Sequence, residues 1–444
     1  MNTTHFAQGL TALAERPLPS SVRAESVRSI LNVVGTTIGA IRAEPVDIIV
    51  GLDRDSESST GSVTLPGRPE RRDPVNAALA IGTAAHFDDF DDTHLATVVH
   101  PAAAVFAAAY PCVSRADVTG EAFVDAVALG IEAQLRVALA MTPWHYDAGW
   151  HITGTVGAIG AAVTVGRLLG LNAVELGHAI AIASSLSVGH REGFGTMVKP
   201  LHPGKAGSNG LLAAFLARRG FTGSPTALEG SRGFFAVLSD QVDLSHLTDG
   251  FGERWEILNN TYKPYPCGIV THPGIEAAEE LSAQVGTQEI TAVRLYGHSL
   301  VSELTGNRDP KTGLAARFST VHGVAAGLLD GKVGLDQYDD ERVVQPDLVT
   351  LRAKCELITD ATIDRDAAFL QVDLNDGTTL EHRVVHARGS LGRPLTEDEL
   401  DDKVRGLIMR NAPRTAATII RAVRDLPTAA SCQDLIATLT EENK

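Results

Sequence analysis

Residues 155–170, TVGAIGAAVTVGRLLG, decide the fold class of this 444-residue chain. Small residues recur there at helical spacing, and Arg167 is the only charged residue in the stretch. A helix whose faces are all small or apolar is buried, and small side chains let neighbouring helices approach closely. The surrounding low-charge run is about fifteen residues long, which is shorter than a bilayer span requires. The stretch therefore predicts the central helix of a compact all-α domain.

The segments around this stretch repeat the helical pattern. Apolar residues recur at three- and four-residue steps over residues 22–42, which is typical of an amphipathic helix. Further helices are predicted at residues 75–87, 102–109, 120–141, 152–169 and 173–186.

The pattern changes after residue 259. Residues 291–296 alternate as a strand does, and residues 369–374 and 379–385 flank Asn375-Asp376-Gly377, a hairpin turn signal. Helices are predicted at 318–329 and 400–410, the latter after the acidic stretch TEDELDD. The expected fold is mostly α. A large all-helical domain (1–258 and 396–444) carries a smaller α+β lid domain (259–395), inserted before the C-terminal helices.

Composition excludes several classes of protein. Lys and Arg number 38 and Asp and Glu 54, a net charge of −16, which argues against nucleic acid as a partner. Hydrophobic residues make up 44% and charged residues 21%, as in a soluble globular chain. The four cysteines form no CxxC pair, which favours reduced thiols over disulfides or structural zinc. The first twenty residues show no secretory signal, so we expect a cytoplasmic protein with no membrane partner.

Polar residues gather in four stretches that are otherwise apolar. These are HFDDFDDTH (86–94) with His100 just beyond, WHYDAGWHIT (144–153), HREGFGTMVKPLHPGK (190–205) and YKPYPCGIVTH (262–272). More than half of the 15 histidines lie in them. Because the imidazole pKa is close to neutrality, this concentration indicates proton transfer or ligation.

Each stretch also has a structural interpretation. Four aspartates in five residues can be a solvated helix turn, and His151 can be a buried ring whose hydrogen bonds are satisfied. Lys199 and Lys263, each next to a proline, can be exposed loop lysines. Gly193-Phe-Gly195 lacks the strand–turn–helix context of a phosphate loop, so no dinucleotide cofactor is expected. A catalytic role requires the four stretches to converge.

The aspartate run allows one different chemistry. Asp88, Asp89, Asp91 and Asp92 match the DDxxD pattern with which prenyl transferases and terpene synthases hold Mg²⁺ against a diphosphate. Against this alternative, the chain has no second aspartate-rich motif and only 5% aromatic residues, few for sheltering a carbocation.

Taken together, the stretches resemble the MmgE/PrpD family, which includes 2-methylcitrate dehydratase, cis-aconitate decarboxylase and iminodisuccinate epimerase. The resemblance is carried by AHFDDFDDTH…HP (85–101), GWHITGTVGAIGAA (149–162), GFGTMVKPLHPGKAGSNG (193–210) and YKPYPCGIVTHP (262–273). It implies a homodimer, a helical domain with an α+β lid, and neither a metal nor an organic cofactor. It also implies an active site between the domains, at positions corresponding to Asp89, Thr93, His100, His151, Lys199 and Lys263. A tyrosine position of the family falls at His322, a departure that puts the reaction type in doubt.

The substrates of this family, small di- and tricarboxylates, suit the residues. Loss of a proton next to a carboxylate creates extra negative charge, which Lys199 and Lys263 can neutralise. His151 is the predicted base and His100 the complementary acid, with Asp89 orienting a histidine. The remaining candidates are Tyr146 as a second proton donor, His322 as a further catalytic group, Thr93 as a substrate ligand, and His202 and Arg191 as helpers in binding.

The predicted function is therefore that of a lyase which removes an α-proton from a polycarboxylate, first of all a dehydratase. Epimerisation and decarboxylation on the same site are the alternatives, and the Mg²⁺-dependent diphosphate enzyme is a more distant one. A non-catalytic binding protein on the same scaffold is the remaining hypothesis.

Overall fold

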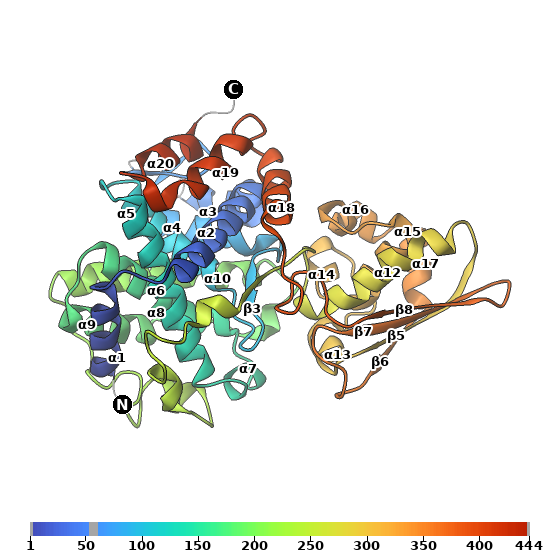
Figure 1. Cartoon of the computed structure of the whole chain (residues 1–444), viewed down its shortest axis with the longest axis horizontal. Coiled ribbons are helices and arrows are strands. Elements are labelled where there is room, and N and C mark those ends of the chain that lie inside the picture. Colours follow the sequence, from blue (N-terminus) through green and yellow to red (C-terminus); the bar gives the residue numbers. More distant parts are fainter. Residues whose placement is uncertain (1–2, 53–60, 442–444) are drawn as a thin grey trace.

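The computed structural model describes residues 3–52 and 61–441. Figure 1 shows a large helical body on one side and a smaller part, built on a sheet, on the other. The expectation of a mostly α fold with a smaller α+β portion is confirmed. Within the described ranges, no helix has both the length and the apolar character that crossing a membrane requires.

The body is made of helices that come from both ends of the chain. Its core cluster runs from Phe6 to Tyr262 and resumes from Leu395 to Leu439. The body helices are α1 (Thr3–Ala14), α2 (Ser20–Ala40), α3 (Glu44–Gly51), α4 (Pro74–Phe87), α5 (Pro101–Val113), α6 (Gly120–Leu139), α7 (Trp144–Asp147), α8 (Ile152–Leu168), α9 (Ala173–Ser185), α10 (Val198–Arg218), α11 (Phe234–Leu238), α18 (Glu397–Met409), α19 (Ala416–Arg424) and α20 (Gln433–Thr440).

Close helix packing aligns two of the polar stretches. Helix α10 packs against α4, α5, α8 and α9 in the middle of the body. A Cβ atom on Gly82 of α4 would lie 2.6 Å from the Cα of Gly204 in α10, and one on Gly204 would lie 2.4 Å from the Leu79 carbonyl oxygen. The backbones can approach this closely only because both residues are glycine. The contact brings the end of α4 next to the start of α10.

The smaller part, which we call the lid, has its own core from Tyr265 to Ala387. Its four strands lie in the order β6-β5-β7-β8, with β5 and β6 parallel and the other pairs antiparallel. Helix α12 packs against β7, β8 and α15. The lid elements are α12 (His272–Val285), β5 (Ile290–Gly297), α13 (Leu300–Thr305), α14 (Gly313–Ala316), α15 (Thr320–Asp330), α16 (Asp340–Val343), α17 (Pro346–Ala353), β6 (Cys355–Thr359), β7 (Ala368–Leu374) and β8 (Thr379–Val384).

The chain passes from body to lid just after a short ladder. Strand β3 (Asp92–His94) pairs with β4 (Asn260–Tyr262), which fixes the segment before Lys263 to the segment after Asp91. A second ladder joins β1 (Val63–Thr64) to β2 (Arg71–Arg72). Because the core clusters change between Tyr262 and Tyr265 and between Ala387 and Leu395, we propose that they are the cores of two domains. The boundaries then lie within a few residues of those predicted (1–258 with 396–444, and 259–395), with Tyr262 and Leu395 belonging to the body.

Candidate active site

A narrow cavity of about 40 Å³ lies where the body meets the lid. The body contributes most of the polar side chains, and the lid contributes mostly apolar ones together with Lys263 and Thr305. Its lining residues are Asp89, Thr93, Val98, His100, Tyr146, His151, Phe194, Lys199, Lys263, Gly268, Ile269, Val270, Leu304, Thr305 and Phe318. All four polar stretches of the sequence therefore meet at one place.

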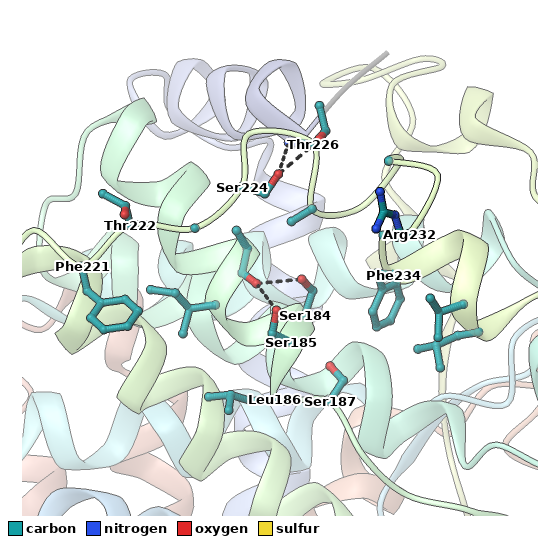
Figure 2. A pocket seen from close by; sticks show the side chains of 18 of the residues that line it. Ser184, Ser185, Leu186, Ser187, Phe221, Thr222, Ser224, Thr226, Arg232 and Phe234 are labelled. Carbon is teal, nitrogen blue, oxygen red and sulfur yellow. Dashed lines mark hydrogen bonds between the residues drawn. The ribbon is translucent and has the colours of Figure 1, made fainter.

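A larger pocket of about 830 Å³ lies elsewhere on the body, between α9, the end of α10 and residues 221–238. Figure 2 shows Ser184, Ser185 and Ser187 on its floor. Arg232 is the only titratable side chain in its lining. Because proton transfer needs titratable groups, the smaller cavity is the candidate active site.

Asp89 joins the two lysines at the centre of the cavity. Its Oδ1 accepts from Lys199 Nζ at 2.6 Å and lies 3.2 Å from Lys263 Nζ, which also donates to the Asp89 carbonyl oxygen at 3.0 Å. Burial disfavours the charged carboxylate, but the ammonium groups of Lys199 and Lys263 outweigh it and hold the Asp89 pKa well below its usual value. Asp89 Oδ2 is buried without a partner among the described residues. One carboxylate oxygen is therefore the shared counter-charge of both ammonium groups.

Cations from other elements hold the turn that carries Asp89. Asp89 has a φ of +49°, a left-handed conformation that Asp tolerates better than most residues. Arg317 of the lid donates to the Asp88 carbonyl oxygen at 2.7 Å and to its Oδ1 at 2.8 Å. Lys403 of α18 donates to the Phe90 carbonyl oxygen at 2.8 Å. The turn is thus held on both sides of Asp89, which directs its carboxylate toward the lysines.

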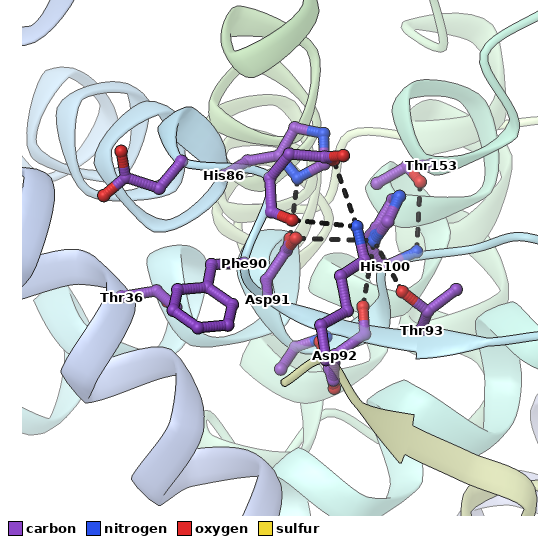
Figure 3. A network of polar contacts seen from close by, with 12 residues as sticks. Thr36, His86, Phe90, Asp91, Asp92, Thr93, His100 and Thr153 are labelled. Carbon is purple, nitrogen blue, oxygen red and sulfur yellow. Dashed lines mark hydrogen bonds and ion pairs between the residues drawn. The ribbon is translucent and has the colours of Figure 1, made fainter. Parts of the chain in front are cut away.

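His86, which is not among the predicted site residues, orients Lys199. Its Nδ1 lies 2.7 Å from Asp91 Oδ2 and its Nε2 lies 2.7 Å from Lys199 Nζ. A carboxylate accepts and an ammonium donates, so Nδ1 carries the hydrogen and Nε2 accepts. Figure 3 shows His86, Asp91 and His100 in one network of polar contacts. Asp91 was missed as well, although both residues lie in the quoted stretch 86–94.

His100 presents a free nitrogen to the cavity. Its Nδ1 lies 2.9 Å from the Asp92 carbonyl oxygen, 3.1 Å from Thr93 Oγ1 and 3.4 Å from Asp91 Oδ1. The carbonyl can only accept, so Nδ1 donates and Nε2 keeps its lone pair. Burial and the Lys263 ammonium hold the His100 pKa well below its usual value, against the opposing effect of Asp91. His100 is therefore neutral at neutral pH, with the lone pair of Nε2 toward the cavity.

His151 lies on the same wall, behind an apolar cover. Its Nδ1 is 2.8 Å from Nδ1 of His202, so its Nε2 is the nitrogen left for the cavity. Burial, followed by the Lys199 ammonium, holds the His151 pKa well below its usual value. Phe194 meets the ring edge-on at 5.0 Å, and Lys199 Nζ lies 5.3 Å from the centre of the Phe194 ring. Phe318 covers the same ammonium at 5.1 Å.

Three predicted residues do not line the cavity. His202 supports His151 from behind. Arg191 lies outside, with its guanidinium 4.2 Å from the centre of the Tyr146 ring. His322 is buried in the lid: its Nε2 donates to the Gln337 carbonyl oxygen at 2.8 Å and its Nδ1 accepts from Arg352 Nη1 at 3.1 Å. With both ring nitrogens engaged there, His322 is separated from the candidate site, which corrects the expectation of a catalytic role.

Metal ligation is limited by the same contacts. His86, Asp89, Asp91 and His100 each offer one ligand atom, all within 4.8 Å of one another. The Lys199 ammonium already binds two of these groups, and a dication there would be repelled by the lysines. The four aspartates of the DDxxD run are buried, and each has a protein partner within its described surroundings. This arrangement differs from the open oxygen ligands that Mg²⁺ and a diphosphate need.

Comparisons with known proteins show the family of the chain. The MmgE/PrpD N-terminal domain matches residues 4–247 and the MmgE/PrpD C-terminal domain matches residues 265–427. Cis-aconitate decarboxylase of Mus musculus is 27% identical over 96% of this chain and 91% of that protein, and the Homo sapiens protein is 28% identical over 98% and 94%. 2-Methylcitrate dehydratase of Cupriavidus necator is 26% identical over 81% of each chain. The chain belongs to the MmgE/PrpD family.

Proposed function

We propose that this protein is a lyase that acts on a small di- or tricarboxylate by proton transfer at a carbon next to a carboxylate. The observation that carries the proposal is the position of Lys199 and Lys263 on one oxygen of Asp89, in a narrow cavity with two neutral imidazoles. Two cations that share the one carboxylate of Asp89 leave positive charge for an anionic ligand. The same ammonium groups stabilise the extra negative charge that develops when the proton leaves or CO₂ departs.

His100 is the stronger candidate for the proton-transferring group. Its Nδ1 is held by the Asp92 carbonyl, and the Asp91 carboxylate is close enough to stabilise the imidazolium. His151 has only the neutral His202 behind it. A bound polycarboxylate offsets the charge of the lysines, so it raises the pKa of both imidazoles toward the range that general acid–base catalysis uses. The predicted assignment of His151 as base is therefore reversed in this proposal.

Decarboxylation of a cis-aconitate-like substrate is the first candidate reaction. The two cis-aconitate decarboxylases align over 96% and 98% of this chain, and the dehydratase over 81%. Phe194, Phe318 and Leu304 give the cavity an apolar wall. A carboxylate held against apolar side chains is less stable than the neutral CO₂ that it releases.

Dehydration, the reaction that the sequence favoured, is the second candidate, and Tyr146 supports it. The Tyr146 side chain lines the cavity, and burial raises its pKa to about 12. The phenol therefore stays protonated and can donate to a departing hydroxyl group.

Incubation in D₂O with cis-aconitate or 2-methylcitrate, followed by NMR, separates the reactions. We expect deuterium at the carbon that loses CO₂ for decarboxylation, a new double bond for dehydration, and exchange without net loss for epimerisation. The same rate with and without EDTA is expected, because the lysines stabilise the charge. Absence of turnover and of exchange with these acids and other di- and tricarboxylates would show that the proposal is wrong.

A further inference from the structure

A groove of about 480 Å³ on the surface adjoins the narrow cavity of the candidate active site. It is lined by Gly149, His190, Arg191, Glu192, Phe194, Glu303 and Leu304. Phe194 of the body and Leu304 of the lid also line the cavity, so these two side chains form the wall between the two spaces. We call this space the entrance groove.

An ion pair joins body and lid across the entrance groove. Arg191 Nη2 donates to Glu303 Oε1 at 3.2 Å, and Glu303 belongs to α13 of the lid. The guanidinium of Arg191 is held in place by Tyr146, whose carbonyl oxygen accepts from Nη1 at 3.1 Å. The Glu303 side chain is 50% exposed and that of Arg191 18%. Arg191 is thus the fixed member of the pair, and Glu303 is the exposed one.

The size of the cavity requires the wall to open. A cavity needs roughly 10–15 Å³ of space for the centre of a water molecule to hold one water, and a di- or tricarboxylate has many more non-hydrogen atoms than one water. At about 40 Å³ the cavity holds only a few waters, so we expect Phe194 and Leu304 to move apart when a polycarboxylate enters. Separation of these side chains also pulls Glu303, the neighbour of Leu304, away from Arg191.

We propose that the entrance groove is a first binding site for the substrate, in which a carboxylate of the substrate replaces Glu303 on Arg191. The exchange is between two groups of the same chemistry, and an exposed ion pair contributes little to stability, so the replacement costs little. The freed Glu303 no longer holds the lid to the body. From Arg191, the way inward leads past Phe194 to the stronger positive charge of Lys199. This inference rests on the proposed function, because it requires a carboxylate ligand.

The association rate constant tests the proposal, with citrate as a tricarboxylate probe. Trp150, which pairs with His190 in an isolated bridge beside the entrance groove, supplies the fluorescence signal for stopped-flow measurements. Glu303→Gln removes the competing carboxylate, so we expect association at low salt to become at least about threefold faster. Arg191→Gln should slow it by a similar factor. In the double variant, Glu303→Gln should bring no further gain.

The control is Glu289→Gln, which removes one negative charge from the lid at a pair with Lys354 far from the groove. Its association rate should equal that of the unchanged protein, and the differences for the Arg191 and Glu303 variants should shrink at high salt. Binding of citrate with the same rate in all variants would overturn the entrance site and leave the proposed function standing. Failure of the unchanged protein to bind citrate, cis-aconitate or succinate would overturn both.

Discussion

His145 and His100 each place one ring nitrogen against a backbone carbonyl. His145 Nδ1 lies 2.8 Å from the Leu238 oxygen, and His100 Nδ1 lies 2.9 Å from the Asp92 oxygen. The second nitrogen of His145 accepts from the Thr155 hydroxyl at 2.7 Å, whereas that of His100 remains for the cavity. Burial keeps both rings neutral, but only His100 has a lone pair to use. The free Nε2 therefore distinguishes His100, the candidate reactive histidine, from His145, the structural one.

Replacement of Lys199 with Met should reduce turnover by at least about 100-fold, the effect of removing one preorganised charge-stabilising donor. The protein should still fold, because Lys263 remains beside Asp89 and prevents an unpaired buried carboxylate. The measurements are kcat from NMR and the circular dichroism spectrum. Lys205→Met is the matched control: Lys205 lies on the same helix, is exposed, and should leave kcat unchanged. Equal kcat values for the two variants would remove Lys199 from the site.

His202 should act on the reaction through His151. His202→Leu removes the partner of His151 Nδ1 and should lower kcat by up to about 100-fold, the cost of a misplaced catalytic group. His202→Asn keeps an oxygen acceptor near the same place and should lose less. Nitrogen-15 NMR of the His151 ring supplies a readout that does not depend on activity. A base at Nε2 requires His151 Nδ1 to carry the hydrogen and donate to His202, so we expect this tautomer in the unchanged protein and in His202→Asn, and a mixture of tautomers in His202→Leu.

Sequence motifs located the cavity better than they assigned roles within it. Lys199 and Lys263 stand out because lysines are scarce in the chain, and both line the cavity. His86 and Asp91 lie in the same run as Asp89, but only the turn with its positive φ decides which aspartate faces the lysines. His322 was misjudged because a position along a helix does not tell which partners surround a side chain. Those partners come from residues 337 and 352.

At the level of elements, the contact between α4 and α10 sets the distance from His86 to Lys199. His86 lies in the last turn of α4, and Lys199 lies in the first turn of α10. The contact between Gly82 and Gly204 brings these two helix ends together. A Cβ atom on Gly204 would also lie 2.5 Å from Thr83 Oγ1, so neither helix has space to give way. The glycines therefore maintain the geometry of the site from outside the cavity.

Gly204→Ala should destabilise the protein by about 1–3 kcal/mol, the usual cost of overpacking a core. Gly406→Ala in α18 is the control, because no atom lies within 4 Å of its added Cβ. That variant should stabilise the protein by up to about 1 kcal/mol, since alanine is the better helix former. Urea unfolding measures both free energies. Unchanged stability in Gly204→Ala would show that the two backbones can separate without loss.

The sequence predicted some elements well and others poorly for local reasons. Asn375-Asp376-Gly377 predicted the turn between β7 and β8, which the structure confirms with Gly377 at a φ of +87°. Helix α10 was not predicted, because Pro200 and Pro203 in its first two turns and its glycines hide the apolar period. Its small residues serve packing against four helices at once, which no single-helix pattern encodes.

At the scale of the whole molecule, buried neutral histidines make the free energy of unfolding depend on pH. Burial lowers the pKa of His145 and of His322 to about 4, and that of His272 to about 3, from an unfolded value near 6.5. As the pH falls below 6.5, the unfolded chain therefore takes up protons at these histidines before the folded chain does. The contribution of these neutral rings to the free energy of unfolding is complete above pH 6.5, and it is lost as the pH falls toward 4.

His145→Asn should flatten this dependence. Asparagine cannot titrate, so the free energy of unfolding should fall less steeply between pH 6.5 and 4, by up to about 1.4 kcal/mol per pH unit. Urea unfolding at pH 7, 6 and 5 gives the two slopes. Parallel slopes for the variant and the unchanged protein would mean that His145 is already charged in the folded state.

Assembly is a separate prediction at this scale. The family resemblance implies a homodimer, for which light scattering should give twice the chain mass of 46.9 kDa. A mass of 46.9 kDa at the concentrations used for activity would contradict it.

The position of Lys263 has a consequence for release of the product. Lys263 directly follows the β3–β4 ladder, at the point where the chain leaves one core for the other. Any swing of the lid about this point shifts the Lys263 ammonium relative to Asp89. A lid motion that opens the cavity would therefore also weaken the binding of the departing anion. One hinge would then couple release of the product to the loss of affinity for it.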